Sequence, residues 1–131
     1  MAHLALLPGV VFLFIDFFFW FVHKVVIVSN STKMLSIIGQ VLKSELKVDY
    51  FKLDGQTPAK DRFPLVQRFN GHAKERVFLL SSKAGGCGLN LIGANRLIMY
   101  DPDWNPANDN QAMARVWRQG QTKKVFIYRL L

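Results

Sequence analysis

The pattern that most constrains this chain is an alternation of short apolar runs with segments of helical spacing, which begins at residue 24. The runs occupy residues 24–29, 50–53, 76–81, 96–100 and 125–131. Runs this short and this apolar are typical of parallel strands that are covered on both faces. Because parallel neighbours are joined by helical crossovers, the alternation predicts an α/β fold, with a parallel sheet and helices on both faces.

The segments between these runs predict three helices. The first is capped by Asn30 or Ser31, and its apolar residues recur at helical spacing to about residue 47. Gly39 is expected to weaken this helix without ending it. The third helix is expected over residues 107–117.

The second helix carries a proline in its interior. Thr57 is expected to be its N-cap and Pro58 its first residue, and the Asn70-Gly71 pair is expected to end it. Its buried face is expected to contain Phe63, Val66 and Phe69. Because Pro64 has no backbone N–H, we expect it to kink the helix or to shift its start.

A segment of different composition precedes the alternation. Residues 4–22 are an apolar run with six of the eleven phenylalanines, which only Pro8, Gly9 and Asp16 interrupt. The run is long enough to span a bilayer, but Asp16 opposes insertion, and no Lys or Arg precedes the run as in a secretory signal. Three interpretations of residues 1–23 stay open. They are a membrane anchor or signal, an element packed into the domain, or a non-native start from a gene-model or splicing artefact.

The charge of the chain belongs to residues 24–131. The whole chain has a net charge of +8, and without Asp16 the remainder has 17 Lys+Arg against 8 Asp+Glu, or +9. This balance excludes an acidic disordered tail and favours an anionic partner, such as nucleic acid, phosphates or an acidic membrane. The single cysteine, Cys87, excludes a disulfide scaffold, and the spacing of Cys and His predicts no structural zinc site.

Two loops that follow strands carry groups suited to phosphate. Ser29 and Asn30 open the first helix, where backbone N–H groups and hydroxyls can bind an anion, although a plain N-cap explains them as well. Residues 81–90 read SSKAGGCGLN, so Ser81, Ser82 and Lys83 precede closely spaced glycines. This loop is not a Walker A motif, and a tight turn from strand to helix is the simpler alternative. Cys87 lacks a nearby histidine, so we do not expect a catalytic thiol.

Two further segments carry an aromatic residue and a pair of arginines. Trp104 lies between prolines in DPDWNPAND, where it is either a core residue or a contact for nucleic acid. The segment QAMARVWRQGQ places Arg115 and Arg118 three residues apart on one helical face, with Gln111 one turn earlier. Arginines so placed can bind phosphate oxygens in phosphoryl transfer, or they can form a solvated basic face.

Five motifs in order carry a family resemblance, namely KVVIVSN, LDGQT, FLLSSKAGGCGLNL, DPDWNP and QAMARVWRQGQ. Through them residues 24–131 resemble the C-terminal helicase-like lobe of Swi/Snf-type DNA-dependent ATPases, closest to the branch that acts in homologous recombination. The resemblance implies a RecA-like lobe, the second of two that close around ATP with Mg²⁺ and move along double-stranded DNA. The first lobe would bind most of the nucleotide.

The resemblance also implies roles for individual residues. Arg115 and Arg118 would be arginine fingers that reach the γ-phosphate, and Gln111, Gly88 and Asn90 would lie at the ATP site. The expected DNA contacts are Ser29, Asn30, Ser81, Ser82, Lys83, Trp104 and Arg62.

The chain departs from the family pattern in several places. It holds no Walker A sequence and no acidic motif, it starts with the Phe-rich segment, and it stops where relatives continue with a helix. We therefore expect an incomplete lobe, inactive as an ATPase by itself and nuclear in location. Its expected partners are DNA and the first lobe, with the strand-exchange recombinase and nucleosomes as further ones. The alternatives are a non-catalytic module that binds DNA or the recombinase, and a basic domain anchored in a membrane by residues 4–22.

Overall fold

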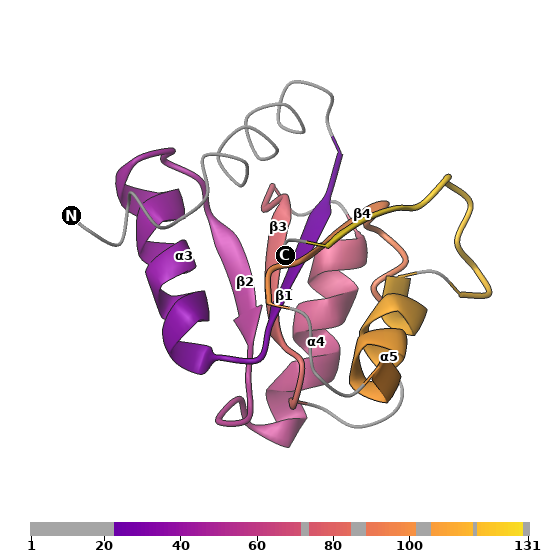
Figure 1. Ribbon diagram of the computed structural model, residues 1–131. Coiled ribbons are helices and arrows are strands. Elements are labelled where there is room, and N and C mark those ends of the chain that lie inside the picture. The colour runs from indigo at the N-terminus through magenta and orange to yellow at the C-terminus, as the bar shows by residue number, and fades with distance from the viewer. Residues whose placement is uncertain (1–22, 72–73, 85–88, 102–105, 117, 130–131) are drawn as a thin grey trace.

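The computed structural model describes residues 23–71, 74–84, 89–101, 106–116 and 118–129. The elements are β1 (Val25–Ser29), α3 (Thr32–Ser44), β2 (Tyr50–Leu53), α4 (Ala59–Asn70), β3 (Val77–Ser81), β4 (Arg96–Met99), α5 (Pro106–Val116) and β5 (Phe126–Arg129). Each strand and helix expected from the sequence is present (Figure 1). The main difference in bounds is that α3 ends at Ser44, not near residue 47.

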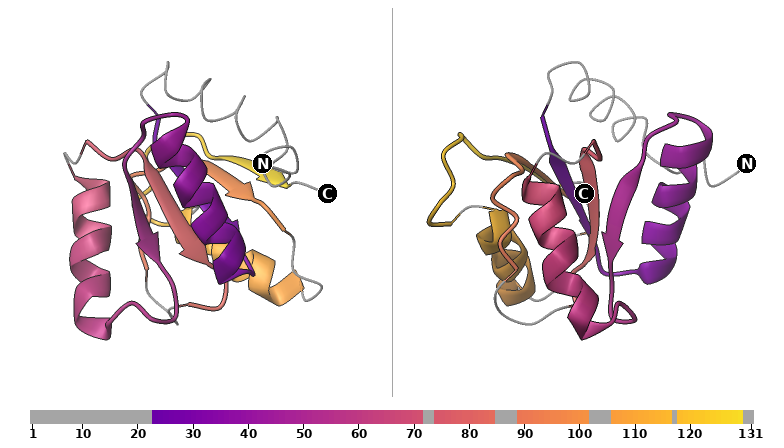
Figure 2. Two further views of the ribbon diagram at one scale, coloured as in Figure 1. Left: turned by 90° about the vertical axis from the view of Figure 1, so that its left-hand side faces the viewer. Right: turned by 180° about the vertical axis from the view of Figure 1, so that it is seen from behind.

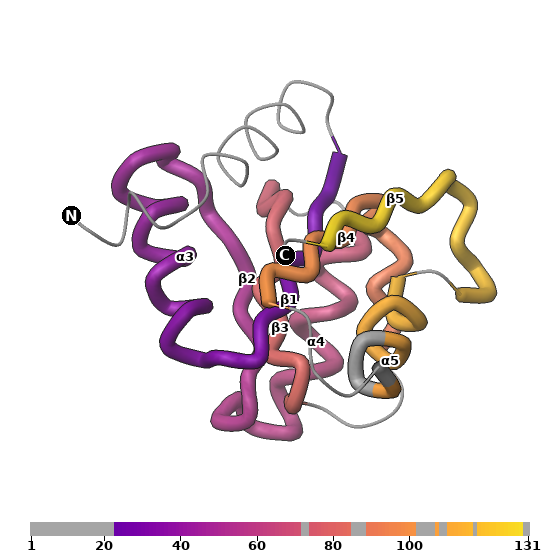
Figure 3. Tube along the Cα trace, viewed as in Figure 1, coloured from indigo at the N-terminus to yellow at the C-terminus, as the bar shows by residue number. Residues whose placement is uncertain are grey.

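The strands form one parallel sheet in the order β2-β3-β1-β4-β5, which the tube in Figure 3 shows with β5 at one side. The central strand β1 pairs with β3 and β4, so that Val25 lies opposite both Val77 and Arg96. The expectation of a parallel α/β sheet is confirmed. Because all five strands run the same way, the loops that follow them gather at one edge, called here the carboxyl edge.

Helices cover both faces of this sheet, as the alternation predicted. Val25 and Ile27 of β1 pack toward α3, which is the one helix on this face among the described elements. Val26 and Val28 point to the other face, where α4 and α5 lie (Figures 1 and 2). All four residues from Val25 to Val28 are thus buried and apolar, because a central parallel strand is covered on both faces.

The start of α4 differs from the expectation in its capping. The N-cap is Pro58, and α4 begins at Ala59 without a side-chain cap. Thr57 instead closes the preceding turn, because its Oγ1 accepts a hydrogen bond of 3.0 Å from the backbone N of Asp54. The helix continues through Pro64, and since Lys60 and Pro64 are both exposed, water can reach the carbonyl that the proline leaves without a helical donor.

The buried face of α4 is narrower than expected. Val66 and Phe69 are buried as predicted, but Phe63 is 67% exposed. Phe63 lies three positions before Val66 and six before Phe69, and the rotation of the helix over these intervals carries Phe63 past the contact with the sheet.

The end of α4 is held by a buried lysine at the start of β1. Lys24 donates from Nζ to the carbonyl oxygens of Phe69 and Gly71, the second at 2.8 Å, and its ammonium lies 5.3 Å from the centre of the Phe69 ring. Burial and the nearby charges of Arg76 and Lys123 lower the pKa of Lys24. The helix therefore ends at the predicted Asn70-Gly71 pair, with a cation on its last carbonyls.

Within the described residues, no helix has the length and apolar character needed to cross a membrane. The apolar run at residues 4–22, on which the membrane alternative depends, lies outside the described part of the chain.

Candidate functional site

Asp101 joins the loop after β4 to the loop after β1. Its carboxylate accepts a hydrogen bond of 2.7 Å from Ser29 Oγ and another of 2.7 Å from the backbone N of Asn30. Its carbonyl oxygen accepts from Asn30 Nδ2 at 3.3 Å. Burial and this carboxylate together raise the pKa of the Tyr100 hydroxyl.

The loop after β3 joins the same network. Ser82 donates from Oγ to Asn30 Oδ1, and its backbone N donates to the carbonyl of Ser29 at 3.0 Å. The predicted DNA contacts Ser29, Asn30, Ser81, Ser82 and Lys83 are thereby brought together at the carboxyl edge.

These five residues differ in what a ligand could reach. Ser29 and Ser81 are buried, at 0% and 3% exposure. Asn30 and Ser82 are half-buried, and Lys83 is exposed. The side chains of the two buried serines thus bond to neighbouring protein groups. A large ligand could contact the side chains of the other three residues directly.

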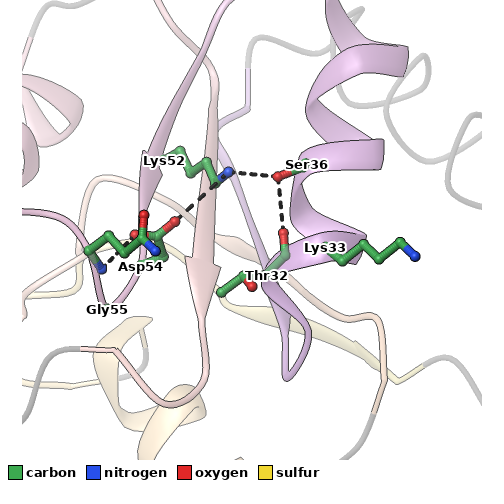
Figure 4. Close-up of a pocket in the computed structure, with 7 residues that line it drawn as sticks. Thr32, Lys33, Ser36, Lys52, Asp54 and Gly55 are labelled. Carbon is green, nitrogen blue, oxygen red and sulfur yellow. Dashed lines mark hydrogen bonds and ion pairs between the residues drawn. The ribbon is translucent and has the colours of Figure 1, made fainter.

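Arg62 lies at the same edge, in the first turns of α4, where its Nε donates to the carbonyl of Thr57 at 3.0 Å. Beside this turn, a hollow of about 290 Å³ separates the start of α3 from the end of β2 (Figure 4). It is lined by Thr32, Lys33, Ser36, Lys52, Asp54, Gly55 and Gln56. Lys52 donates to Ser36 Oγ at 3.0 Å and pairs with Asp54 at 3.9 Å, so its positive charge is partly compensated within the protein.

The arginines lie at the far end of α5 from this edge. Arg115 is in the last turn and is 9% exposed, whereas Gln111, one turn earlier, is exposed. Arg118 is exposed and follows the end of the helix at Val116. The expectation that both arginines share one helical face is therefore wrong, because the helix stops between them.

The chain that follows the Gly-rich loop returns to this end of α5. The backbone N of Leu91 donates to the carbonyl of Arg115 at 2.9 Å. Gln121 Nε2 donates to the carbonyls of Ala94 at 2.8 Å and Val116 at 3.0 Å. The predicted ATP-site residue Asn90 thus adjoins the segment that is bonded to Arg115, more than 20 residues away in the sequence.

Asn70, the last residue of α4, fixes the same segment from the opposite side. Its Nδ2 donates to the carbonyl of Asn90 at 2.6 Å, and its Oδ1 accepts from the backbone N of Gly93 at 2.8 Å. A Cβ on Gly93 would lie 2.7 Å from Asn70 Cα, so only glycine allows this approach. We call residues 90–94 the clamped segment, since it is bonded to both α4 and α5.

Some predicted residues lie outside the described part of the chain, namely Gly88, Cys87 and Trp104. Conversely, the sequence reasoning missed four residues that organise the site, which are Lys24, Asn70, Asp101 and Gln121. The sequence does contain an indication for Asp101. It directly follows the predicted strand at residues 96–100, and polar residues at the carboxyl ends of parallel strands often belong to sites. Asn70 was interpreted only as the end of a helix, because its partners are distant in the sequence.

Comparison with known sequences identifies the family. Residues 19–120 match the helicase conserved C-terminal domain. The chain belongs to this family. The expected resemblance is confirmed, as is the RecA-like fold of the lobe.

Individual relatives narrow the comparison further. The chain is 59% identical over 109 residues to the DNA repair and recombination protein RAD54-like of Danio rerio, and this covers 82% of the chain and 15% of the relative. It is 56% identical to Protein CHROMATIN REMODELING 25 of Arabidopsis thaliana, again over 82% of the chain and 12% of the relative. The chain therefore spans only about a seventh of the length of these relatives.

A solved structure supports the same fold, that of a helicase C-terminal lobe. The C-terminal part of the Fun30 ATPase domain superposes with a TM-score of 0.82 at 41% sequence identity. The superposition covers 87% of this chain and 36% of the other.

Proposed function

We propose that this chain is the second motor lobe of an ATP-dependent double-stranded DNA translocase that acts in recombinational DNA repair. Its family and its relatives, which are named as DNA repair and recombination proteins, support this proposal. A protein with this role acts in the nucleus, which is the location that we propose for this chain. Nucleosomes and the strand-exchange recombinase are the further partners that we propose.

We assign DNA binding to the carboxyl edge of the sheet. Asn30, Ser82 and Lys83 lie together there with side chains at least partly exposed, and Arg62 lies at the start of α4 on the same edge. Hydroxyl, amide and cationic groups in one cluster are the donors that bind a phosphate backbone without reading its bases. The net charge of +9 on residues 24–131 favours the same partner.

We assign nucleotide contact to the other end of α5. The observation that carries this assignment is the hydrogen bond from Leu91 to Arg115, which joins the Gly-rich motif to the arginine-bearing helix. Arg118 is exposed, as a residue that reaches a nucleotide held by another lobe has to be. Arg115 is largely buried, and we place it deeper in the same site.

The two surfaces are separated by the length of a short helix. The 11 residues of α5 rise by about 16 Å between the carboxyl edge and the arginines. A movement of the arginines at the nucleotide can therefore be transmitted to the DNA-binding edge by the single helix α5. Arg115 and Arg118 would supply cationic groups that stabilise charge on the transferred phosphate, and ATP with Mg²⁺ would be held mainly by the first lobe.

A reconstitution experiment tests this proposal. The chain alone, with ATP, Mg²⁺ and double-stranded DNA, is expected to show no DNA-stimulated hydrolysis, and addition of a separately purified first lobe is expected to restore it. Arg118→Ala should lower the restored rate by about 10³- to 10⁵-fold, the usual contribution of an arginine finger.

The control is Arg68→Ala, which removes an exposed arginine on α4 and should leave the rate nearly unchanged. If the first lobe restores no hydrolysis while the chain still binds DNA, the alternative of a non-catalytic binding module is favoured. Restored hydrolysis that survives Arg118→Ala would contradict the role of this arginine.

A further inference from the structure

We infer that Asp101 is a positioning residue, whose carboxylate holds the loop after β1 in the conformation that binds DNA. The inference rests on the proposed function of the carboxyl edge. Asp101 itself is not proposed to touch DNA, and its charge alone would repel a phosphate.

A carboxylate at an edge that is proposed to bind anions needs an explanation, and the hydrogen bonds of Asp101 provide one. One oxygen accepts from Ser29 Oγ and the other from the backbone N of Asn30, both at 2.7 Å. A carboxylate that accepts such hydrogen bonds has much of its charge compensated locally. Each oxygen thus has a donor from the loop after β1, which reduces the repulsion that this carboxylate would exert on a phosphate.

The network fixes Asn30 from three sides. Its backbone N donates to the Asp101 carboxylate, its Nδ2 donates to the Asp101 carbonyl, and its Oδ1 accepts from Ser82 Oγ. Ser29 Oγ also accepts from the backbone N of Ser31, the N-cap of α3, at 3.1 Å. Removal of the carboxylate would therefore take away two of these bonds, and the loop after β1 would be held at this place by the weaker 3.3 Å bond from Asn30 Nδ2 to the carbonyl of residue 101.

The charge and the positioning role predict opposite effects on DNA affinity. If Asp101 acted only as a negative charge, its removal would raise the net charge by one and strengthen binding. If Asp101 holds the loop, its removal weakens binding although the chain becomes more basic. The sign of the change therefore distinguishes the two roles.

The experiment measures binding of a fluorescent 20-base-pair duplex by the full chain at about 50 and 200 mM salt, where phosphate contacts make affinity fall steeply. Asp101→Ala is expected to bind about 10-fold more weakly and with a shallower dependence on salt, because fewer phosphates are contacted. Asp101→Asn, which keeps one acceptor oxygen, should fall between wild type and Asp101→Ala.

Asp49→Asn is the matched control. It removes the same charge from an exposed residue that pairs with Lys74, away from the carboxyl edge, and it should change affinity less than 2-fold. Thermal unfolding of each variant shows whether the fold is retained. Hydrogen exchange at the Asn30 amide provides a second measurement, and this exchange should accelerate in Asp101→Ala, which removes the acceptor of this N–H, while β1 stays protected.

Each outcome decides between the two claims. Equal or tighter binding by folded Asp101 variants would overturn the inference and leave the proposed function intact, and so would unchanged exchange at Asn30. A wild-type chain that fails to bind DNA in a salt-dependent way would overturn the proposed DNA binding, and the inference with it. If Asp101→Ala does not fold, Ser29→Ala removes one donor, and unchanged binding by both this variant and Asp101→Asn would overturn the inference.

Discussion

Gly93 shows how the site depends on single residues. The backbone at this position approaches α4 so closely that a Cβ would lie 2.7 Å from Asn70 Cα and 2.9 Å from Asn70 Oδ1. The nearest of these atoms, Asn70 Cα, belongs to the backbone of α4 and cannot rotate away as the end of a flexible side chain could. The hydrogen bonds between Asn70 and the clamped segment exist only because this position is glycine.

Gly93→Ala is therefore expected to lower the free energy of unfolding by about 1–3 kcal/mol, the usual cost of overpacking. Gly55→Ala is the control, because its added Cβ would meet no atom within 4 Å. Urea unfolding measures both variants. Equal stability of the two variants would show that the clamped segment can move away from α4.

At the scale of elements, α4 shows how the rotation of a helix sorts residues of the same type. Phe69 is fully buried, with its ring centre 5.2 Å from that of Phe78 and 6.4 Å from that of Phe51. Phe63 lies on the same helix and is 67% exposed. The two phenylalanines therefore form a matched pair in which only burial differs.

Phe69→Ala is expected to cost about 3–5 kcal/mol, because it empties a space among buried rings. Phe63→Ala should change the free energy of unfolding by less than about 0.5 kcal/mol, as at other exposed positions. Thermal or urea unfolding of the two variants tests this. A large cost for Phe63→Ala would mean that some contact covers this residue in solution.

At the scale of the whole molecule, the start of β1, the start of β4 and the loop before β5 meet at the edge opposite the proposed DNA edge. Burial, together with the charges of Arg96 and Lys123, lowers the pKa of His23 there. This lowered pKa means that the folded state disfavours the charged form of the His23 imidazole. The unfolded chain, where His23 keeps its ordinary pKa near 6.5, then takes up the proton more readily.

Stability is therefore expected to fall as the pH drops below about 6.5, and to gain nothing further from His23 above it. The measurement is the difference in melting temperature between about pH 5.5 and pH 7.5, for wild type and for His23→Gln. The difference should be smaller in the variant, because glutamine does not titrate. An equal difference would show that other groups carry the pH dependence.

The sequence determined the fold of residues 24–131 and the family to which the chain belongs. Strand runs and helical spacing act locally, and a parallel sheet with both faces covered is the arrangement that buries such runs. The same pattern misplaced Thr57 and Phe63, because turn closure by Thr57 and the rotation of α4 depend on contacts with other segments.

Only the tertiary structure decided which residues hold the site together. Ser29 is joined to Asp101, Asn70 to Gly93, and Lys24 to the end of α4, across 23 to 72 residues of sequence. Hydrogen bonds of this kind leave no periodic signal, since they depend on how the elements come together in space. The sequence therefore predicted which residues are chemically suited to bind DNA and phosphate, and the packing of the sheet and helices determined which of them are buried and which are exposed.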